Sequence, residues 1–256
     1  MSYQLTAKPG RGEKIHLSVN GKYIATTDKT TWYSFGYPDK TELDLETLQN
    51  LLDRVAQQRM YNKALDLLSQ REYTRKELTD KLVRKTVQER KNRARREKRK
   101  QSEHAELPYE DDSRNFGVTD ASFSTIELDA QQADYTELRQ RAEAICDHLE
   151  EVGLLSDERF ARIYAEEQLR NKHLSANGLR VALRQKGVSR ELSDLIVEEL
   201  EPDPEESIRA LLQTKFRTRN LEEERDRRRT VNALLRLGYS YSDINQVIQE
   251  TRSSNE

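Results

Sequence analysis

Apolar residues recur along most of the chain at intervals of three and four positions, the spacing of one buried face of an α-helix. The first such stripe begins at Asp44, with Leu45, Leu48, Leu52 and Val55. Later stripes predict further helices at Ala64, Leu65, Leu67 and Leu68; Leu78, Leu82 and Val83; Leu138, Ala142, Ile145 and Leu149; Phe160, Ile163, Tyr164 and Leu169; Leu179 and Leu183; Leu192, Leu195 and Ile196; and Ile244, Val247 and Ile248. The pattern predicts a mainly α protein built from short helices.

The first forty residues follow a different pattern. Residues 14–27 alternate apolar and polar positions, and Asn20-Gly21 is the pair best suited to a tight turn with two positive φ angles. This segment is therefore predicted to be a β-hairpin. We expect the aromatic residues that follow to pack the hairpin onto the first helix, because a lone hairpin is marginally stable. These residues are Trp32, Tyr33, Phe35 and Tyr37.

The sequence of one predicted helix end occurs twice in the chain. The segment ALRQKGVS, residues 182–189, returns as ALLRLGYS, residues 233–240. Gly187 and Gly238 stand where a left-handed residue ends a helix, and a serine two positions later can cap the next one. A fainter copy, KLVRKTV at 81–87, has Thr86 in place of the glycine. The chain is therefore predicted to repeat a three-helix unit three times, each unit covering its neighbour's apolar stripe.

The predicted fold class is mainly α: an elongated tandem array of three three-helix repeats with a short N-terminal β-hairpin extension. We expect the extension at 1–43. A linking helix and the first repeat follow at 44–152, interrupted by a charged insertion at 86–135. The second repeat is expected at 153–202 and the third at 203–256.

The charge of the insertion is strongly segregated. Between Arg84 and Lys100 there are ten basic residues and two acidic ones, whereas acidic residues dominate after Glu103. We expect the basic half to extend a helix and the acidic half to be mobile. Our hypothesis is that the acidic half folds over the basic half when no partner is bound.

Composition excludes several classes of protein. Charged residues make up 35% of the chain and hydrophobic residues 34%, with no apolar run of membrane-spanning or signal-peptide type. We therefore expect a cytoplasmic protein without membrane contact. Cys146, the one cysteine, is expected to be a buried small residue. The four histidines lack metal-ligand spacing, and no phosphate-binding glycine loop occurs, so we expect no enzyme activity, metal or cofactor.

Basic residues gather near the three predicted corners and along the insertion. If the repeats stack regularly, these residues form a discontinuous positive track that suits phosphates or an acidic protein groove. The candidate residues for binding DNA or an acidic protein groove are Arg71, Arg75, Lys76, Arg84, Lys85, Arg93, Arg95, Arg96, Arg180, Arg184, Lys186, Arg227, Arg228, Arg229 and Arg236.

Three segments carry a family likeness. They are ALDLLSQREYTRKELTDKLVRK at 64–85, the segment from LEEVGLLSDERF to RQKGVS at 149–189, and RRRTVNALLRLGYSYSDINQVI at 227–248. In this order they closely resemble RecX, the bacterial regulator of the RecA recombinase, and the hairpin with WYSFGY at 32–37 looks like the N-terminal extension of longer RecX proteins. The resemblance implies a protein of three-helix repeats that lies in the groove of a RecA filament on single-stranded DNA and suppresses ATP hydrolysis and strand exchange.

Our leading interpretation is a monomeric, non-enzymatic modulator whose partners are the RecA filament and single-stranded DNA; non-specific binding to duplex DNA, and assistance instead of inhibition, stay open. The alternative is a helix–turn–helix protein that reads duplex DNA directly. Against it, RELSDLIVEEL at 190–200 has four acids and one base on the helix that would enter the groove. An enzyme ranks third.

Overall fold

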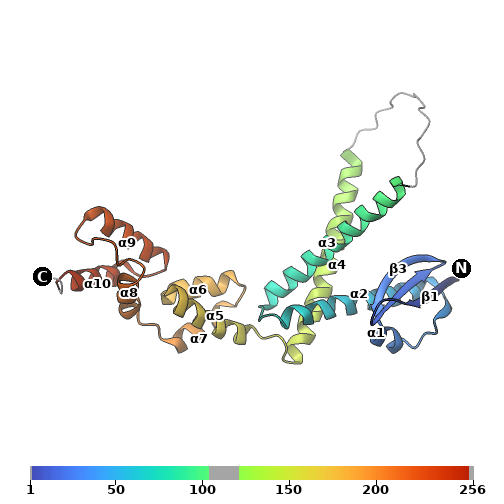
Figure 1. Cartoon of the computed structure of the whole chain (residues 1–256), viewed down its shortest axis with the longest axis horizontal. Coiled ribbons are helices and arrows are strands. Elements are labelled where there is room, and N and C mark those ends of the chain that lie inside the picture. Colours follow the sequence, from blue (N-terminus) through green and yellow to red (C-terminus); the bar gives the residue numbers. More distant parts are fainter. Residues whose placement is uncertain (1, 104–120, 254–256) are drawn as a thin grey trace, which may run out of the picture. The chain divides into compact units, whose positions relative to one another are not determined.

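The computed structural model describes residues 2–103 and 121–253 (Figure 1). Within these ranges the side chains of residues 93, 97, 98 and 100–133 are not described. The chain divides into two compact units. One contains Met1–Arg71 and Thr79–His148, and the other contains Glu72–Leu78 and Leu149–Glu256. The fold is mainly helical with a small N-terminal antiparallel sheet, which confirms the predicted fold class, while the elongation and the domain boundaries stay predictions.

The N-terminal sheet has four antiparallel strands in the order β3-β2-β1-β4. These are β1 (Tyr3–Pro9), β2 (Lys14–Val19), β3 (Lys22–Asp28) and β4 (Lys40–Leu43). The predicted hairpin is confirmed as β2 and β3, and its turn residues Asn20 and Gly21 have φ angles of 48° and 78°. The sequence analysis missed β1 and β4, which pair with each other and extend the hairpin to a sheet that can bury one face.

The sheet packs against two helices, α1 (Lys29–Ser34) and α2 (Leu45–Leu68). Trp32 is fully buried in this core, and Phe35 and Tyr37 are partly buried against it, as predicted. Tyr33 is 66% exposed, so the prediction was wrong for this ring. The helix α2 is one helix where two were predicted, because no glycine or proline interrupts the segment between the two stripes.

Two long helices complete the first unit: α3 (Arg75–Glu103) and α4 (Ala121–Glu151). They run antiparallel, since Thr79 lies 3.4 Å from Cys146 and Asp80 lies 3.6 Å from Arg139. Cys146 is fully buried, as expected. The corner predicted at Thr86 is absent: α3 continues through it, and the Thr86 hydroxyl donates to the Leu82 carbonyl (2.9 Å).

The acidic half of the insertion is only partly described. Residues 104–120 lie outside the described part of the chain, so their predicted mobility is untested. The backbone is helical from Ala121 onward. Among the described side chains of the insertion, an ion pair between Arg90 and Asp134 joins the two halves. This pair agrees with the hypothesis that the acidic half folds over the basic half, but it involves one residue of the basic half and one of the acidic half.

The second unit holds two three-helix repeats. The second repeat consists of α5 (Asp157–Lys172), α6 (Ala176–Gln185) and α7 (Arg190–Leu200), and the third consists of α8 (Pro204–Gln213), α9 (Glu224–Arg236) and α10 (Tyr241–Ser253). Each repeat has its own buried cluster, centred on Leu179 and Leu183 in the second and on Leu234 and Ile244 in the third. Each repeat therefore has an apolar core of its own.

Burial corrects three predicted stripes. Leu45 is 51% exposed, Ile163 is 51% exposed and Leu195 is 49% exposed, although all three were assigned to buried faces. The buried positions of α7 are Ser193, Ile196 and Val197. They match Ile244, Val247 and Ile248 of α10 in the alignment that superposes Gly187 on Gly238. The sequence pattern was misleading because a serine occupies a core position, where its hydroxyl is satisfied by donating to the Ser189 carbonyl (2.7 Å).

The other two predicted corners, at Gly187 and Gly238, are confirmed. Gly187 and Gly238 have φ angles of 94° and 91°. At each corner the glycine N–H and the next N–H return to carbonyls of the last helical turn, as in Gly187 to Arg184 (3.0 Å) and Val188 to Leu183 (3.1 Å). The hydroxyls of Ser189 and Ser240 then cap the following helices.

The corners also dock one repeat onto the one before it. The carbonyl of Leu237, at the end of α9, accepts from the backbone N–H of Ser175 at the start of α6 (3.1 Å). The carbonyl of Lys186, at the end of α6, accepts from the hydroxyl of Thr74 at the start of α3 (2.7 Å). The helix that precedes each corner thus ends against the N-terminus of the equivalent helix in the preceding repeat: α9 against α6, and α6 against α3. We call this contact the cap-to-cap joint.

Glycine makes the joint between the second and third repeats possible. A Cβ atom at Gly178 would lie 2.2 Å from the Leu237 carbonyl oxygen, and one at Gly238 would lie 2.5 Å from the Gly178 nitrogen. Tyr239, next to the corner, donates its hydroxyl to the His173 carbonyl (2.6 Å). Burial raises the pKa of Tyr239, so this donor keeps its proton at neutral pH.

We predict that Gly178→Ala destabilises the protein. Alanine favours a helix over glycine by about 1 kcal/mol, but the new methyl group would collide with the joint, a cost of about 1–3 kcal/mol. Asn177→Ala is the matched control, because Asn177 is the exposed neighbour on the same helix. Urea unfolding of both variants tests the prediction, and a Gly178→Ala protein at least as stable as the control would contradict the close contact.

A second prediction concerns Asp28, which caps α1 and accepts a hydrogen bond from Asn62 of α2 (3.2 Å). Burial alone would raise the pKa of Asp28, but hydrogen bonds from Thr31 and Asn62 hold it below the usual 3.8. Its stabilising effect is therefore full above pH 3.8 and lost as the pH falls through the lower folded value. Asp28→Ala should cost about 1 kcal/mol at pH 7. In urea unfolding across pH, this difference should shrink in acid; a constant difference would argue against the carboxylate as its source.

Candidate functional site

The predicted basic residues fall into two groups, those held in contacts and those left exposed. Lys186 belongs to the first group. Its ammonium donates to Glu77 (2.7 Å) and lies 5.7 Å from the centre of the Tyr164 ring, while its carbonyl forms the cap-to-cap joint. Lys76 lies beside it, because its side-chain stem covers Gly187. These two lysines therefore help to join the N-terminus of α3 to the second repeat.

Arg75 is held in the same region. Its guanidinium donates to Glu150 (2.6 Å), and its backbone N–H donates to the Asp157 carboxylate (2.7 Å). Asp157 lies in the first turn of α5, where an acidic residue is favourable, and it also reaches the N-terminus of α3. The positive charge of Arg75 is thus paired with Glu150 within the structure.

Arg159 donates four hydrogen bonds in this region, although it was not among the candidate residues. Its guanidinium forms a two-pronged contact with Glu72 (2.6 and 3.2 Å) and donates to the carbonyls of Gly153 (3.2 Å) and Leu154 (3.0 Å). The hydrogen bond to Glu72 raises the pKa of Arg159 above its ordinary value. The sequence signal was the arginine at the third position after the Ser156 cap, where a glutamate is usual.

At the second corner only part of the predicted charge is available. Arg180 is paired with Asp194 (2.8 Å). Arg184 is exposed, and its Nε donates to the Arg180 carbonyl (3.1 Å). Arg184 is therefore the exposed cation of this corner.

The third corner is similar. Arg228 pairs with Glu224 (2.5 Å) and Arg229 lies 3.8 Å from Asp226, both within α9. Arg227 is half-buried and lowers the pKa of Glu222, although the hydrogen bond from Arg252 is the largest cause of that shift. Arg236 is exposed.

The remaining candidates lie before or along α3. Arg71 follows the end of α2 and is exposed. Arg84, Lys85, Arg95 and Arg96 are exposed on α3. Arg93 lies on α3, but its side chain is outside the described set. The alignment that superposes the corner glycines pairs Arg184 with Leu235 and Arg236 with Gln185, so the corner cations do not occupy equivalent positions. The discontinuous positive track stays a prediction.

Sequence reasoning missed a basic loop in the third repeat. Between α8 and α9, Lys215 and Arg217 are exposed, and the Arg219 guanidinium lies 4.5 Å from the centre of the buried Phe216 ring. A groove of about 530 Å³ lies beside this loop. The signal in the sequence is KFRTR, in which basic residues alternate with an aromatic and a small polar residue. This loop adds to the exposed charge of the third repeat.

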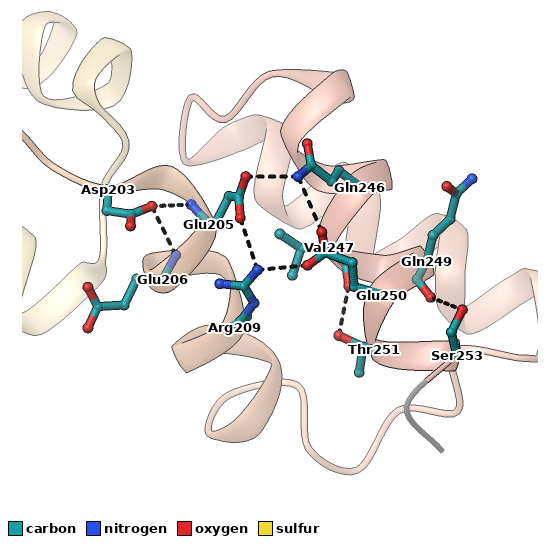
Figure 2. Close-up of polar contacts among 10 residues, drawn as sticks. All are labelled: Asp203, Glu205, Glu206, Arg209, Gln246, Val247, Gln249, Glu250, Thr251 and Ser253. Atoms are coloured by element: carbon teal, nitrogen blue, oxygen red, sulfur yellow. Dashed lines mark hydrogen bonds and ion pairs between the residues drawn. The ribbon is translucent and has the colours of Figure 1, made fainter. Parts of the chain in front are cut away.

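The second helix of the third corner is occupied by contacts inside its own repeat (Figure 2). Arg209 of α8 donates to Glu205 (2.9 Å) and to Glu250 of α10 (2.7 Å). Gln246 of α10 donates to the same two carboxylates, at 2.9 and 3.2 Å. This network ties α8 to α10 and uses the glutamine that could otherwise read a base edge.

Neither a metal centre nor a membrane span is found in the part of the chain that the structure describes. No three His, Cys, Asp or Glu side chains gather there in a way that could hold a metal ion. None of the described helices is long and apolar enough to cross a bilayer.

Tandem three-helix units joined cap to cap define a helical-repeat protein. Three family models match the chain in order: the first three-helix domain of RecX at 61–90, the second at 156–194 and the third at 203–248. These matches support the RecX family and confirm the resemblance.

Named relatives agree with this assignment. The regulatory protein RecX of Streptomyces coelicolor is 34% identical over 113 residues, which cover 43% of this chain and 60% of that protein. The one from Mycobacterium leprae is 33% identical over 110 residues, 42% of this chain and 64% of that protein. The matches thus span less than two thirds of either relative. A crystal structure of regulatory protein RecX superposes with a TM-score of 0.55 at 17% identity, covering 96% of this chain and 98% of that one, and supports the fold.

We predict that Arg159→Ala destabilises the protein by about 1 kcal/mol. The variant leaves Glu72 and the carbonyls of Gly153 and Leu154 without this donor. Because the Arg159–Glu72 pair is partly exposed, the loss of stability is limited. Arg139→Ala is the control, because the closest contact of Arg139 is an exposed pair with Glu143 inside one helix. Thermal unfolding compares the two, and equal losses would show that the four contacts of Arg159 contribute no more than a surface pair.

Proposed function

We propose that the protein is a monomeric regulator of a RecA-type recombinase, which binds the recombinase filament on single-stranded DNA and slows its ATP hydrolysis. The observation that carries this proposal is the match of three successive three-helix domains to RecX, in family order. The names of the relatives, regulatory protein RecX, support a regulatory role.

The repeats give a physical basis for binding a filament. A filament offers the same surface many times, so several weak contacts held in one chain add to a tight interaction. The exposed cations of the second and third repeats are suited to such contacts, since they can meet DNA phosphates or acidic protein surface. They include Arg184, Lys215, Arg217 and Arg236.

Direct reading of duplex DNA is the weaker candidate. A recognition helix needs exposed side chains that bond to base edges. On α7 the exposed positions include Glu191, Glu198 and Glu199, which repel phosphates. On α10, Gln246 is engaged with Glu205 and Glu250 (Figure 2). No observation favours this candidate over the filament regulator.

The prediction is that the protein lowers the DNA-dependent ATPase rate of RecA at substoichiometric amounts. Charge reversal by Arg184→Glu with Arg236→Glu should raise the concentration needed for half-inhibition by about tenfold, because two favourable contacts become repulsive. Co-sedimentation with RecA filaments measures binding in parallel.

Lys22→Glu is the matched control, because Lys22 is an exposed cation on the N-terminal sheet. This variant should inhibit like the unmodified protein. An ATPase rate that stays unchanged with excess protein would overturn the proposed function, and equal effects of both reversals would overturn the role of the corner cations.

A further inference from the structure

The antiparallel pair of α3 and α4 carries a basic stripe. Arg84, Gln88, Lys91 and Arg95 follow one another by four, three and four positions along α3, so they share one face of the helix. With a rise of about 1.5 Å per residue, the stripe is about 16 Å long. Lys85 and Arg96 are exposed one position further round the helix. We call this surface the arm stripe.

Acidic neighbours do not neutralise the arm stripe. Glu89 is turned away from it and pairs with Lys63 of α2. Asp134 of α4 pairs with Arg90, which lies on another face of α3. Among the described residues, Arg84, Lys91 and Arg95 have no ion-pair partner. Like charges on one helix face destabilise it at low salt, so a bound polyanion would relieve a real repulsion.

A groove lies beside the stripe, where α3 meets α4. Its volume is about 450 Å³. The lining residues are Asp80, Arg84, Val87, Gln88, Lys91 and Tyr135. The Tyr135 side chain is 47% exposed, and Arg139 lies one turn further along α4. The one carboxylate of the groove, Asp80, lies 3.6 Å from Arg139, whose charge offsets its own.

We propose that this groove binds single-stranded nucleic acid, with Arg84, Lys91 and Arg95 contacting backbone phosphates and Tyr135 stacking on an unpaired base. Cations beside an exposed aromatic ring are the usual elements of single-strand binding, because each base has a face that can stack. A duplex offers its phosphates to the same cations but keeps its bases stacked on each other. The groove therefore favours a single strand over a duplex.

This site is separate from the proposed regulation of RecA. Lys91, Arg95 and Tyr135 lie outside the three segments that match the RecX domains. The site needs no recombinase, so its test uses the protein and naked DNA alone. Failure of the ATPase experiment would leave it standing, and its own failure would leave the regulation of RecA standing.

Fluorescence anisotropy with a labelled oligothymidylate and the full chain tests the proposal. Lys91→Ala with Arg95→Ala should weaken binding at least about fivefold and reduce the salt slope by about 0.7 for each lost phosphate contact. Tyr135→Ala should also weaken binding at least about fivefold, whereas Tyr135→Phe should retain it, since the ring alone stacks. The matched control is Lys14→Ala with Lys22→Ala, two exposed cations of the N-terminal sheet.

A duplex of the same length completes the experiment. Single-strand binding that exceeds duplex binding and depends on Tyr135 supports the site. Equal binding to both DNAs with no effect of Tyr135→Ala would overturn it in favour of a general phosphate-binding surface. Binding that survives the loss of Lys91 and Arg95 would also overturn it, as would the absence of binding to either DNA. Circular dichroism of each variant confirms that the helices are intact.

Discussion

The docking of one helix end on another holds the repeats of this protein together. In both joints a carbonyl at the C-terminal end of a corner helix meets a donor at the N-terminus of the equivalent helix in the preceding repeat. The negative end of one helix dipole thus meets the positive end of another, and exposed carbonyls at the helix end find partners. Because a side chain would separate the two ends, glycine is required at Gly178 and Gly238 in the joint between the second and third repeats. The short helices could not persist without such neighbours.

This joint also divides the charged residues by role. Arg75, Arg159 and Lys186 lie near the joint and bind Glu150, Glu72 and Glu77 respectively. Their positive charge is used to position helix ends, so it contributes little to the outer surface. Other cations of the corner helices, such as Arg184 and Arg236, remain exposed. Charge-rich composition in this protein therefore serves two purposes, and only the partners of each residue tell them apart.

The long pair of α3 and α4 differs from the other repeats for a local reason. Where the second and third repeats have a glycine, the first has Thr86, which continues the helix. Without a turn, α3 runs on to Glu103 and carries the basic residues with it. The loss of one glycine thus converts a corner into a helical arm with an exposed basic face, and the single-strand site that we propose there depends on this change.

The sequence by itself determined the helical class, the β-hairpin turn and the two corners. These depend on local chemistry, such as positive φ at glycine and serine caps, which a few neighbouring residues fix. The family was also readable, since its three motifs are contiguous segments.

Tertiary structure decided which residues are buried and which charges are free. Leu195 looks like a core residue and is exposed, while Ser193 is buried because its hydroxyl can bond to its own helix. Arg75 looks like a binding residue but is paired with Glu150, far away in the sequence. Tyr135 gains a candidate role only because α4 brings it beside α3. Burial and pairing depend on long-range contacts, and a periodic pattern along one helix contains no information about them.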